Sequence, residues 1–449
     1  MSEALSIERE RALEICEQAL AASPADHTEV VLTAGRQELT RFAGNQIHQN
    51  VAEQDHGVRV RAVIGKRIGV ATSNEVSEQG VAETVEAACK LARLAEPTAE
   101  FISLPEPQQM PEEVRGVPRT AQFGPAERAE AVRKVVTVAE EAEQSASGAF
   151  SVGAGAVAVA NSLGTRAFDE LTSASLRMVF AGDDSSGFAH TVSSDTADID
   201  AEALARVAAE KCALSAHPVE VEPGAYDVVL EEEAVGDMVQ MLGFFGFGAM
   251  GYQEERSPLC GRLGEKVCGE SVSIWDDGLD ERGLRRSFDF EGVPKQRVEL
   301  ITSGVAAGLV YDSFTAGRDP DGDKTSTGHA GPAPNPWGPM PSNLFVACGD
   351  ADPEQMVASV ERGLLVTRFH YTNVLHPKQS VLTGMTRDGT FLIEGGEIVG
   401  GVKNLRFTQS ILEALGRVEM IGAEGKLLGG IWTPAMKIRE FDFSGATEF

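Results

Sequence analysis

The chain has 449 residues, of which 42% are hydrophobic and 24% are charged, and its formal net charge is −29. This length exceeds one ordinary hydrophobic core and predicts two domains, while the balance of residue types is that of a globular protein. A surface this acidic repels phosphate backbones, so we expect no nucleic-acid partner. The sequence holds no run of about 18 apolar residues, the length a membrane-spanning helix needs, so we expect no membrane partner.

The first residues, MSEALSIERERALEICEQAL, are amphipathic and acidic. They lack the basic start and the apolar run of a signal peptide, so we expect a cytoplasmic protein. The six cysteines are scattered without a CxxC pair, and we expect them to be reduced and partly buried.

The first half of the chain predicts a mixed α/β domain. Helical spacing of apolar residues, alternation between apolar and polar residues, and proline-rich breaks mark its elements in chain order. We expect a helix at 5–22, strands at 27–73, a helix at 77–95, a loop at 97–125, a helix at 125–146, strands at 150–195 and a helix at 198–213. The order of helix, strands and helix occurs twice, which suggests a duplicated unit.

A domain boundary is predicted in the segment 217–224, where one His-Pro pair and one Pro-Gly pair interrupt the pattern of helices and strands. We place the domains at 1–220 and 221–449. Beyond the boundary, residues 226–230 predict a strand and 231–242 a helix, and the remainder is rich in Gly and Pro with short alternating segments. The predicted fold class is α+β, with a mixed α/β N-terminal domain followed by a β-rich C-terminal domain.

Several phrases carry a resemblance to a known family. They are RFAGNQIHQN (41–50), GVRV (57–60), SPLCGRLGEKVCGESVSIWDDG (257–278), SFDFEGVPKQRVELITSGVAAGLVYDSFTA (287–316), STGHA (326–330) and YTNVLHPKQSVLTGMTRDGTFLIEGGEIVGGVKNLRFTQSILEAL (371–415). In this order, over most of the chain, they resemble the TldD/PmbA family of peptidase-like proteins, and its PmbA/TldE-like branch most of all. An older label of that family is "modulator of DNA gyrase", but the charge of −29 argues against direct contact with DNA.

The resemblance implies a dimer, either of one chain or of a TldD-like chain with a PmbA-like chain, and a peptide substrate in a central cleft. It also implies that the TldD-like chain carries zinc on an HExxxH helix with a later cysteine. The family's HEAVGH phrase falls on 232–237 here, where Glu232 and Asp237 replace both histidines, and the stretch 420–438 holds no cysteine. Zinc prefers imidazole and thiolate ligands, whereas carboxylates alone suit magnesium, calcium or manganese. We therefore expect no cofactor in this chain and zinc in a TldD-like partner, with Glu232 and Asp237 as candidates for a carboxylate site.

Helix geometry separates these two carboxylates. Positions five apart point about 140° from each other, whereas Glu233 and Asp237, four apart, share a face. One hypothesis is that the glutamates only stabilise the helix start, by about 0.3–1 kcal/mol each. A second hypothesis, which we favour and which is compatible with the first, is that this segment is inactive, the cleft is retained, and a partner chain performs catalysis. A third is a live site for another metal, with Glu233 as general base.

A second candidate region is the predicted hairpin at 384–404, with its turn at Gly395 and Gly396. One hypothesis is that an exposed strand of this hairpin binds a peptide through added main-chain hydrogen bonds. The alternative is that the hairpin belongs to the core. The peptide-cleft candidates are Thr386, Arg387, Asp388 and Gly389, together with His329, for which a surface or loop histidine is the alternative.

The stretch GFFGFGAMG at 243–251 contains a GxGxxG match, but it follows a predicted helix, so it predicts no dinucleotide site. We expect this stretch to be mobile and to line a cleft or an interface. The favoured function is a PmbA/TldE-like subunit of a cytoplasmic metallopeptidase complex that processes or degrades peptides. The alternatives are a self-sufficient metallopeptidase with a carboxylate metal site, and a homodimeric peptide-binding or maturation factor without hydrolytic activity.

Overall fold

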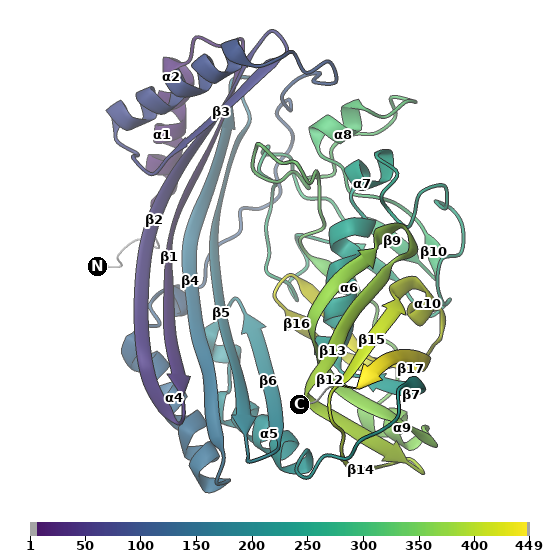
Figure 1. The fold of residues 1–449 in the computed structure, drawn as a ribbon. Helices are drawn as coiled ribbons and strands as arrows, with labels where there is room; N and C mark the ends of the chain where they lie inside the picture. Colours follow the sequence, from purple (N-terminus) through teal and green to yellow (C-terminus); the bar gives the residue numbers. More distant parts are fainter. Residues whose placement is uncertain (1–6, 447–449) are drawn as a thin grey trace.

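The computed structural model describes residues 7–446, which form two β-sheets with their own helices (Figure 1). The first sheet has six strands in the order β3-β2-β1-β4-β5-β6, and every neighbouring pair is antiparallel. These strands are β1 (His27–Ala43), β2 (Gln46–Ile64), β3 (Arg67–Ser73), β4 (Ser145–Asn161), β5 (Arg166–Ala181) and β6 (Ser186–Ser193). Strands β1, β2, β4 and β5 are long and cross most of the height of the molecule, whereas β3 and β6 are short (Figure 1).

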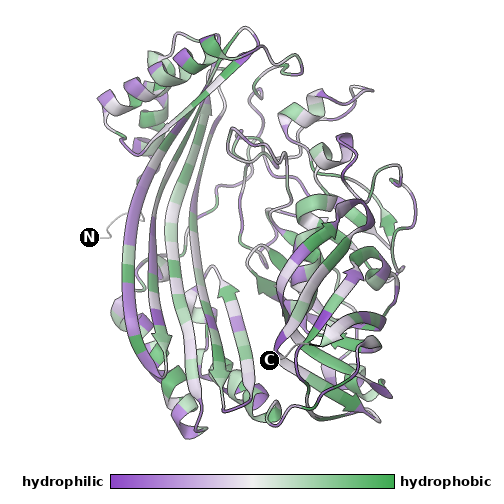
Figure 2. Ribbon diagram, in the orientation of Figure 1, coloured by the Kyte–Doolittle hydropathy of each residue, from purple (hydrophilic) through white to green (hydrophobic). Residues whose placement is uncertain are grey.

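Helices cover one face of the first sheet. They are α1 (Arg9–Ala22), α2 (Glu78–Leu94), α4 (Pro125–Glu141) and α5 (Ala201–Leu214), with the short α3 (Pro118–Ala121) beside them. Two apolar clusters lie under these helices, one around Val60 and Phe168 and one around Phe150 and Leu176. Apolar and polar segments alternate along the long strands (Figure 2), as expected for a sheet with one covered face. No helix among residues 7–446 is long and apolar enough to cross a membrane.

The first sheet is built from a duplicated unit, as the repeated order of elements suggested. The order α1-β1-β2-β3-α2 recurs as α4-β4-β5-β6-α5, and β1 meets β4 in the middle of the sheet, with Glu29 opposite Asn161. The expected element boundaries differ by a few residues. The helix expected from residue 5 begins at Arg9 in the described part, and α4 ends at Glu141 because β4 already begins at Ser145.

The second sheet has eleven strands and mixes parallel and antiparallel pairs. Its strands are β7 (Gly224–Leu230), β8 (Ile274–Asp276), β9 (Val298–Thr302), β10 (Val305–Ala306), β11 (Leu344–Val346), β12 (Arg362–His376), β13 (Val381–Glu394), β14 (Glu397–Gly401), β15 (Leu405–Ser410), β16 (Val418–Leu428) and β17 (Ile431–Ala446). Because β7 pairs with both β12 and β17, strands β17, β15, β13, β12 and β7 close into a ring. The predicted α+β fold class is confirmed, and the division after residue 220 stays a prediction.

The helices of the second half are α6 (Glu232–Gly246), α7 (Ala249–Gln253), α8 (Ser313–Gly317), α9 (Pro353–Ala358) and α10 (Ile411–Gly416). Most of the stretch 243–251 is therefore helical, and Phe247 and Ala249 are fully buried, unlike the mobile segment that we expected. The reason lies in its glycines. A Cβ on Gly243 would lie 2.7 Å from Leu344, so the missing side chain lets α6 pack closely on β11.

Candidate functional site

The first turn of α6 holds the three glutamates singled out in the sequence. Glu231 is the N-cap residue, and Glu232 and Glu233 occupy the first turn, where their charges complement the helix dipole. The Glu231 carboxylate also pairs with Lys211 of α5 at 2.5 Å, which ties the helix start to the first half of the chain.

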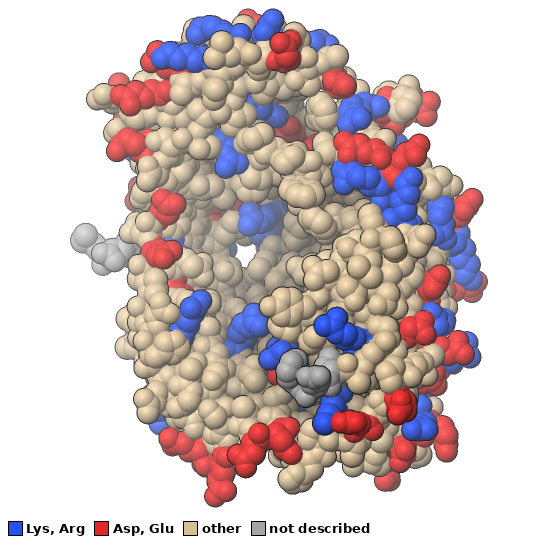
Figure 3. Space-filling view, viewed as in Figure 1, with Lys and Arg blue, Asp and Glu red and all other residues tan. Residues whose placement is uncertain are grey.

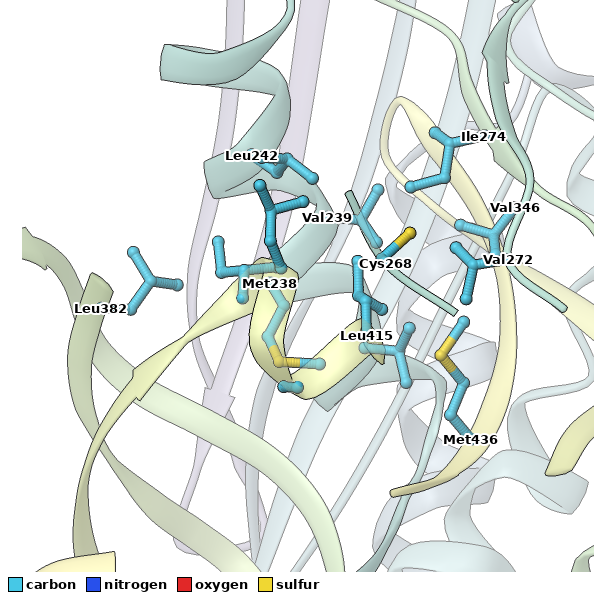
Figure 4. Packing of buried hydrophobic residues seen from close by; sticks show 14 of the residues in the cluster. Met238, Val239, Leu242, Cys268, Val272, Ile274, Val346, Leu382, Leu415 and Met436 are labelled. Atoms are coloured by element: carbon cyan, nitrogen blue, oxygen red, sulfur yellow. The ribbon is translucent and has the colours of Figure 1, made fainter. Parts of the chain in front are cut away.

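The opposite face of α6 anchors the helix in the core. Met238, Val239 and Leu242 are at most 1% exposed. They point into an apolar cluster with residues from several strands (Figure 4), among them Ile274, Val346, Leu382 and Met436. Ala234 and Val235 near the start of the helix belong to the same cluster, so this packing fixes the rotation of the helix and with it the positions of its carboxylates.

Glu233 connects the two sheets. Its Oε1 accepts a hydrogen bond from His190 Nδ1 of β6 at 3.1 Å and lies 3.6 Å from Lys426 Nζ of β16. The other ring nitrogen of His190 lies 3.2 Å from Ser175 Oγ. Burial raises the pKa of Glu233, but the hydrogen bond from His190 and the charges of Lys426 and Arg368 more than offset it, so the pKa lies below its ordinary value. Glu233 is thus an ionised carboxylate engaged by protein groups.

The two residues at the expected histidine positions lie in different surroundings. Glu232 lines a cavity of about 830 Å³ that also borders Lys211 and Lys426, whereas Asp237 accepts a hydrogen bond from Thr372 Oγ1 at 3.1 Å. Burial raises the pKa of both carboxyls, that of Asp237 to about 6. Helix geometry predicted this separation.

These residues do not fit a zinc site. The donors in the substituted phrase are carboxylates alone, and the nearby imidazole of His190 already uses Nδ1 for Glu233 and Nε2 for Ser175. The ammonium of Lys426 lies beside the Glu233 carboxylate, and it would compete with a metal ion for that carboxylate. Within residues 7–446, no group of three or more His, Cys, Asp and Glu side chains has an arrangement that could hold a metal ion.

The hairpin expected at 384–404 is present as β13 and β14, with the turn at Gly395 and Gly396. Thr386 is buried and its hydroxyl accepts a hydrogen bond from the Leu405 N–H at 3.0 Å, whereas Arg387 is exposed. Asp388 binds Arg368, and the positive φ angles of Asp388 (51°) and Gly389 (130°) place a local distortion in the strand. Along this segment β13 pairs with β12, and the role of these residues in a peptide cleft stays a prediction.

His329 lies in a separate buried network. Its Nε2 is 2.7 Å from Asp276 Oδ1 and its Nδ1 is 2.9 Å from Thr327 Oγ1. The ring is fully buried, so it is a loop histidine but not a surface one. Burial lowers the pKa of His329, and the nearby Lys295 ammonium lowers it further. His329 borders a cavity of about 500 Å³, and its role toward a peptide stays a prediction.

A hollow lies between the two sheets, and several Lys or Arg side chains are visible around it although the chain is acidic overall (Figure 3). One cavity in this region has a volume of about 680 Å³. Its floor is the uncovered face of β1, β4 and β5, where small residues such as Gly35, Gly153, Gly155 and Ser173 leave room. Its opposite wall is the segment 281–286.

Sequence reasoning did not identify His190 and Lys426 as partners of Glu233, or this hollow. The alternating small residues of β4, SVGAGA from residue 151, were a usable signal for the hollow, because a sheet face without side-chain bulk leaves space for another chain.

Together the two sheets and the substituted first turn of α6 indicate a peptidase-like protein. Residues 223–445 match the model of the PmbA/TldA metallopeptidase C-terminal domain, and residues 28–92 match that of the PmbA/TldA metallopeptidase domain 1. The chain belongs to the PmbA/TldD metallopeptidase family.

Individual relatives agree with this assignment. The chain is 24% identical to "Metalloprotease PmbA" of Escherichia coli O157:H7, with 93% of each chain covered. It is 26% identical to a "Metalloprotease TldD homolog" of Haemophilus influenzae, but that match spans only about half of each chain, 55% of this one and 54% of the relative.

Solved structures share the fold. The crystal structure of TldE from Thermococcus kodakarensis superposes with a TM-score of 0.87 at 22% identity, covering 97% of this chain and 100% of that one. A protein from Thermotoga maritima described as a modulator of a DNA gyrase also gives a TM-score of 0.87, at 19% identity, with 96% and 100% covered.

Proposed function

We propose that this chain is a PmbA/TldE-like subunit of a cytoplasmic metallopeptidase complex. In this proposal it has no zinc site of its own, pairs with a TldD-like chain, and contributes one wall of the cleft that holds the peptide. The chain itself is then non-catalytic, and hydrolysis takes place in the partner.

The observation that carries this proposal is the engagement of Glu233. Its carboxylate is shared between the His190 imidazole at 3.1 Å and the Lys426 ammonium at 3.6 Å. A general base needs a carboxylate free to take a proton from a substrate or a water molecule, and a pKa near the working pH. Glu233 has neither property, because its Oε1 is engaged by both His190 and Lys426 and its pKa lies below the ordinary value.

The peptide-holding part of the proposal rests on the hollow. Its floor is an uncovered sheet face with glycines at several positions, and its volume of about 680 Å³ is of the size that small ligands or a few residues of a peptide occupy. An extended peptide lies flat over such a surface without displacing side chains.

Co-expression with a TldD-like chain tests the pairing. We expect the two chains to co-purify in equal amounts and the mixture to hydrolyse an unstructured peptide, whereas this chain alone is inactive. If this chain remains a homodimer and the mixture gains no activity, the subunit proposal is wrong and the non-hydrolytic homodimer is favoured.

Elemental analysis of the chain, purified without added metal or chelator, separates the remaining alternative. We expect no stoichiometric metal, and we expect dialysis against a chelator to leave the thermal unfolding midpoint unchanged. A stoichiometric divalent metal whose loss on Glu233→Gln abolishes peptidase activity would establish the self-sufficient carboxylate site instead.

A further inference from the structure

The segment that forms one wall of the hollow carries two adjacent arginines without a carboxylate partner. Among the residues that the structure describes, neither Arg285 nor Arg286 makes an ion pair or a side-chain hydrogen bond, and the buried Nε of Arg285 has no hydrogen-bond partner. Burial lowers the pKa of Arg286, and the charge of Asp169 offsets only part of this effect.

The other arginines of this region are neutralised. Arg36 pairs with Glu38 at 2.9 Å and Arg115 pairs with Glu113 at 2.8 Å, although both line the same cavity as Arg285 and Arg286. A chain with 68 acidic residues and 39 basic ones has many carboxylates to offer. Glu53, Asp55 and Glu281 also line this cavity, but among the described residues none of them forms an ion pair with Arg285 or Arg286. Two partly buried cations left without an ion pair point to a negative charge supplied by a ligand.

The acid whose charge acts on Arg286 is already hydrogen-bonded to other groups. Asp169 raises the pKa of Arg286, but its Oδ1 accepts hydrogen bonds from the Val114 N–H at 2.8 Å and the Ser287 hydroxyl at 2.7 Å. Its Oδ2 accepts from the Ser287 N–H at 2.7 Å. Asp169 thus holds the loop that carries Arg286 in place and leaves the guanidinium available.

Arg286 stands between two cavities with different walls. It lines both the cavity of about 680 Å³ over the first sheet and the cavity of about 500 Å³ that borders His329. The second cavity is walled largely by apolar side chains, including Phe288, Phe290, Met340 and Pro341. A ligand that reaches Arg286 therefore meets positive charge and an apolar pocket side by side.

We propose that Arg285 and Arg286 bind a carboxylate of the peptide in the hollow, and that the cavity beside Phe288 takes a neighbouring apolar side chain. Guanidinium groups bind carboxylates through paired hydrogen bonds, which gives both affinity and orientation. The inference rests on the proposed peptide-binding function. It adds a preference for peptides that carry a carboxylate at this position. The carboxylate comes from the peptide's C-terminus or from an acidic side chain.

This carboxylate site is separate from the first turn of α6. Asp169 beside Arg286 and Arg177 opposite His190 lie on the same strand, eight residues apart. An extended strand rises about 3.4 Å per residue, which separates the two places by roughly 27 Å. A carboxylate bound at Arg286 therefore lies far from Glu233, and only a distant part of the same peptide could reach Glu233.

The test is the binding of three fluorescent peptides of the same apolar sequence to the full-length chain, followed by anisotropy. One peptide has a free C-terminal carboxylate, one has a C-terminal amide, and one has the amide with an internal aspartate. We expect the free acid to bind at least tenfold more tightly than the neutral amide. Arg285→Gln and Arg286→Gln should each remove most of this preference, and Arg286→Lys should keep part of it because the charge remains.

Arg256→Gln is the matched control, because Arg256 is an exposed arginine of the same half, pairs with Glu254 at 2.6 Å and lines neither cavity. It should leave the preference unchanged. If the amide with the internal aspartate binds tightly, and this binding is lost in Arg285→Gln and Arg286→Gln, then the arginines bind an acidic side chain and the inference is supported. Equal binding of the free acid and both amides overturns it and leaves peptide binding intact, and no binding of any peptide overturns both.

Discussion

His190 and Glu233 link the two halves of the chain, with Nδ1 of the histidine on β6 lying 3.1 Å from Oε1 of the glutamate on α6. The contact spans 43 residues of sequence and joins the edge of the first sheet to the helix that resembles the family's zinc helix. At the segment that resembles the HEAVGH phrase, this chain has a hydrogen bond between its two halves, and Lys426 Nζ lies 3.6 Å from the same carboxylate oxygen. Glu233 thus has a structural role, which can be tested by substitution.

Glu233→Gln should destabilise the protein while leaving the activity of a TldD-containing mixture unchanged. The substitution removes a charged hydrogen bond with His190, which is worth about 1.5–3 kcal/mol. Because the pKa of Glu233 is lowered in the folded state, this stabilisation is present above the ordinary carboxyl range and is lost as pH falls through the folded-state pKa. Urea unfolding at pH 7.5 and pH 3.5 measures the difference between wild type and variant.

Glu232→Gln is the matched control for that experiment. Burial raises the pKa of Glu232, and no ion pair of its carboxylate occurs among the described residues, so removing its charge should not destabilise the protein at neutral pH. Equal losses of stability in both variants would contradict the structural role assigned to the contact between His190 and Glu233.

Asp237→Asn should stabilise the protein at neutral pH. Burial raises the pKa of Asp237 from 3.8 to about 6, so the folded state binds a proton more tightly than the unfolded state. The stability of the wild type therefore falls as pH rises between about 4 and 6, and the variant avoids a loss of roughly 1–3 kcal/mol. The amide oxygen still accepts the hydrogen bond from Thr372. A difference in unfolding free energy that does not grow between pH 4 and pH 7.5 would refute this explanation.

The fold was predictable from the sequence to the extent that it depends on local patterns. Alternating apolar residues predicted the strands of the first sheet and some of those of the second, and the order of helix, strands and helix that occurs twice in the sequence recurs in the first sheet. The length of α6 was not predictable, because Gly243 and Gly246 lower helix propensity while their missing side chains allow the packing that stabilises the helix.

The candidate site was predictable only in part, for a different physical reason. The replacement of both histidines by Glu232 and Asp237 follows from the resemblance to the family's phrase, and helix spacing alone predicts the face shared by Glu233 and Asp237. The partners that determine the charge of Glu233 come from β6 and β16, far away in sequence. Only the tertiary fold brings them together, and no spacing rule relates them.

Gly389→Ala should destabilise the protein more than Gly395→Ala. The φ angle of Gly389 is 130°, and a Cβ there would lie 2.4 Å from Thr367 Oγ1, whereas Gly395 has a φ of 58° and nothing within 4 Å. Strain at such a position costs about 1–3 kcal/mol, and the clash adds to it, while alanine at Gly395 costs about 1 kcal/mol. Thermal unfolding of both variants gives the comparison, and equal midpoints would show that the strand relaxes freely around Gly389.

Arg61→Leu should produce the largest loss of stability among these variants. Arg61 on β2 pairs with Glu29 on β1 and, at 3.1 Å, with Glu291 of the second half, and all three side chains are at most 12% exposed. Removing the guanidinium leaves two buried carboxylates without a counter-ion, which costs about 3–5 kcal/mol.

The pH dependence of the Arg61→Leu variant distinguishes lost charge pairing from lost packing. Burial already raises the pKa of Glu29 to about 7 in the presence of Arg61. Without Arg61 this pKa rises further, so the Glu29 carboxyl takes up a proton as pH falls and the deficit should shrink from pH 8 to pH 5. Arg11→Leu, at an exposed ion pair with Glu14, is the control and should change stability little at either pH. A deficit that stays constant with pH would mean that Arg61 acts through packing rather than through its charge.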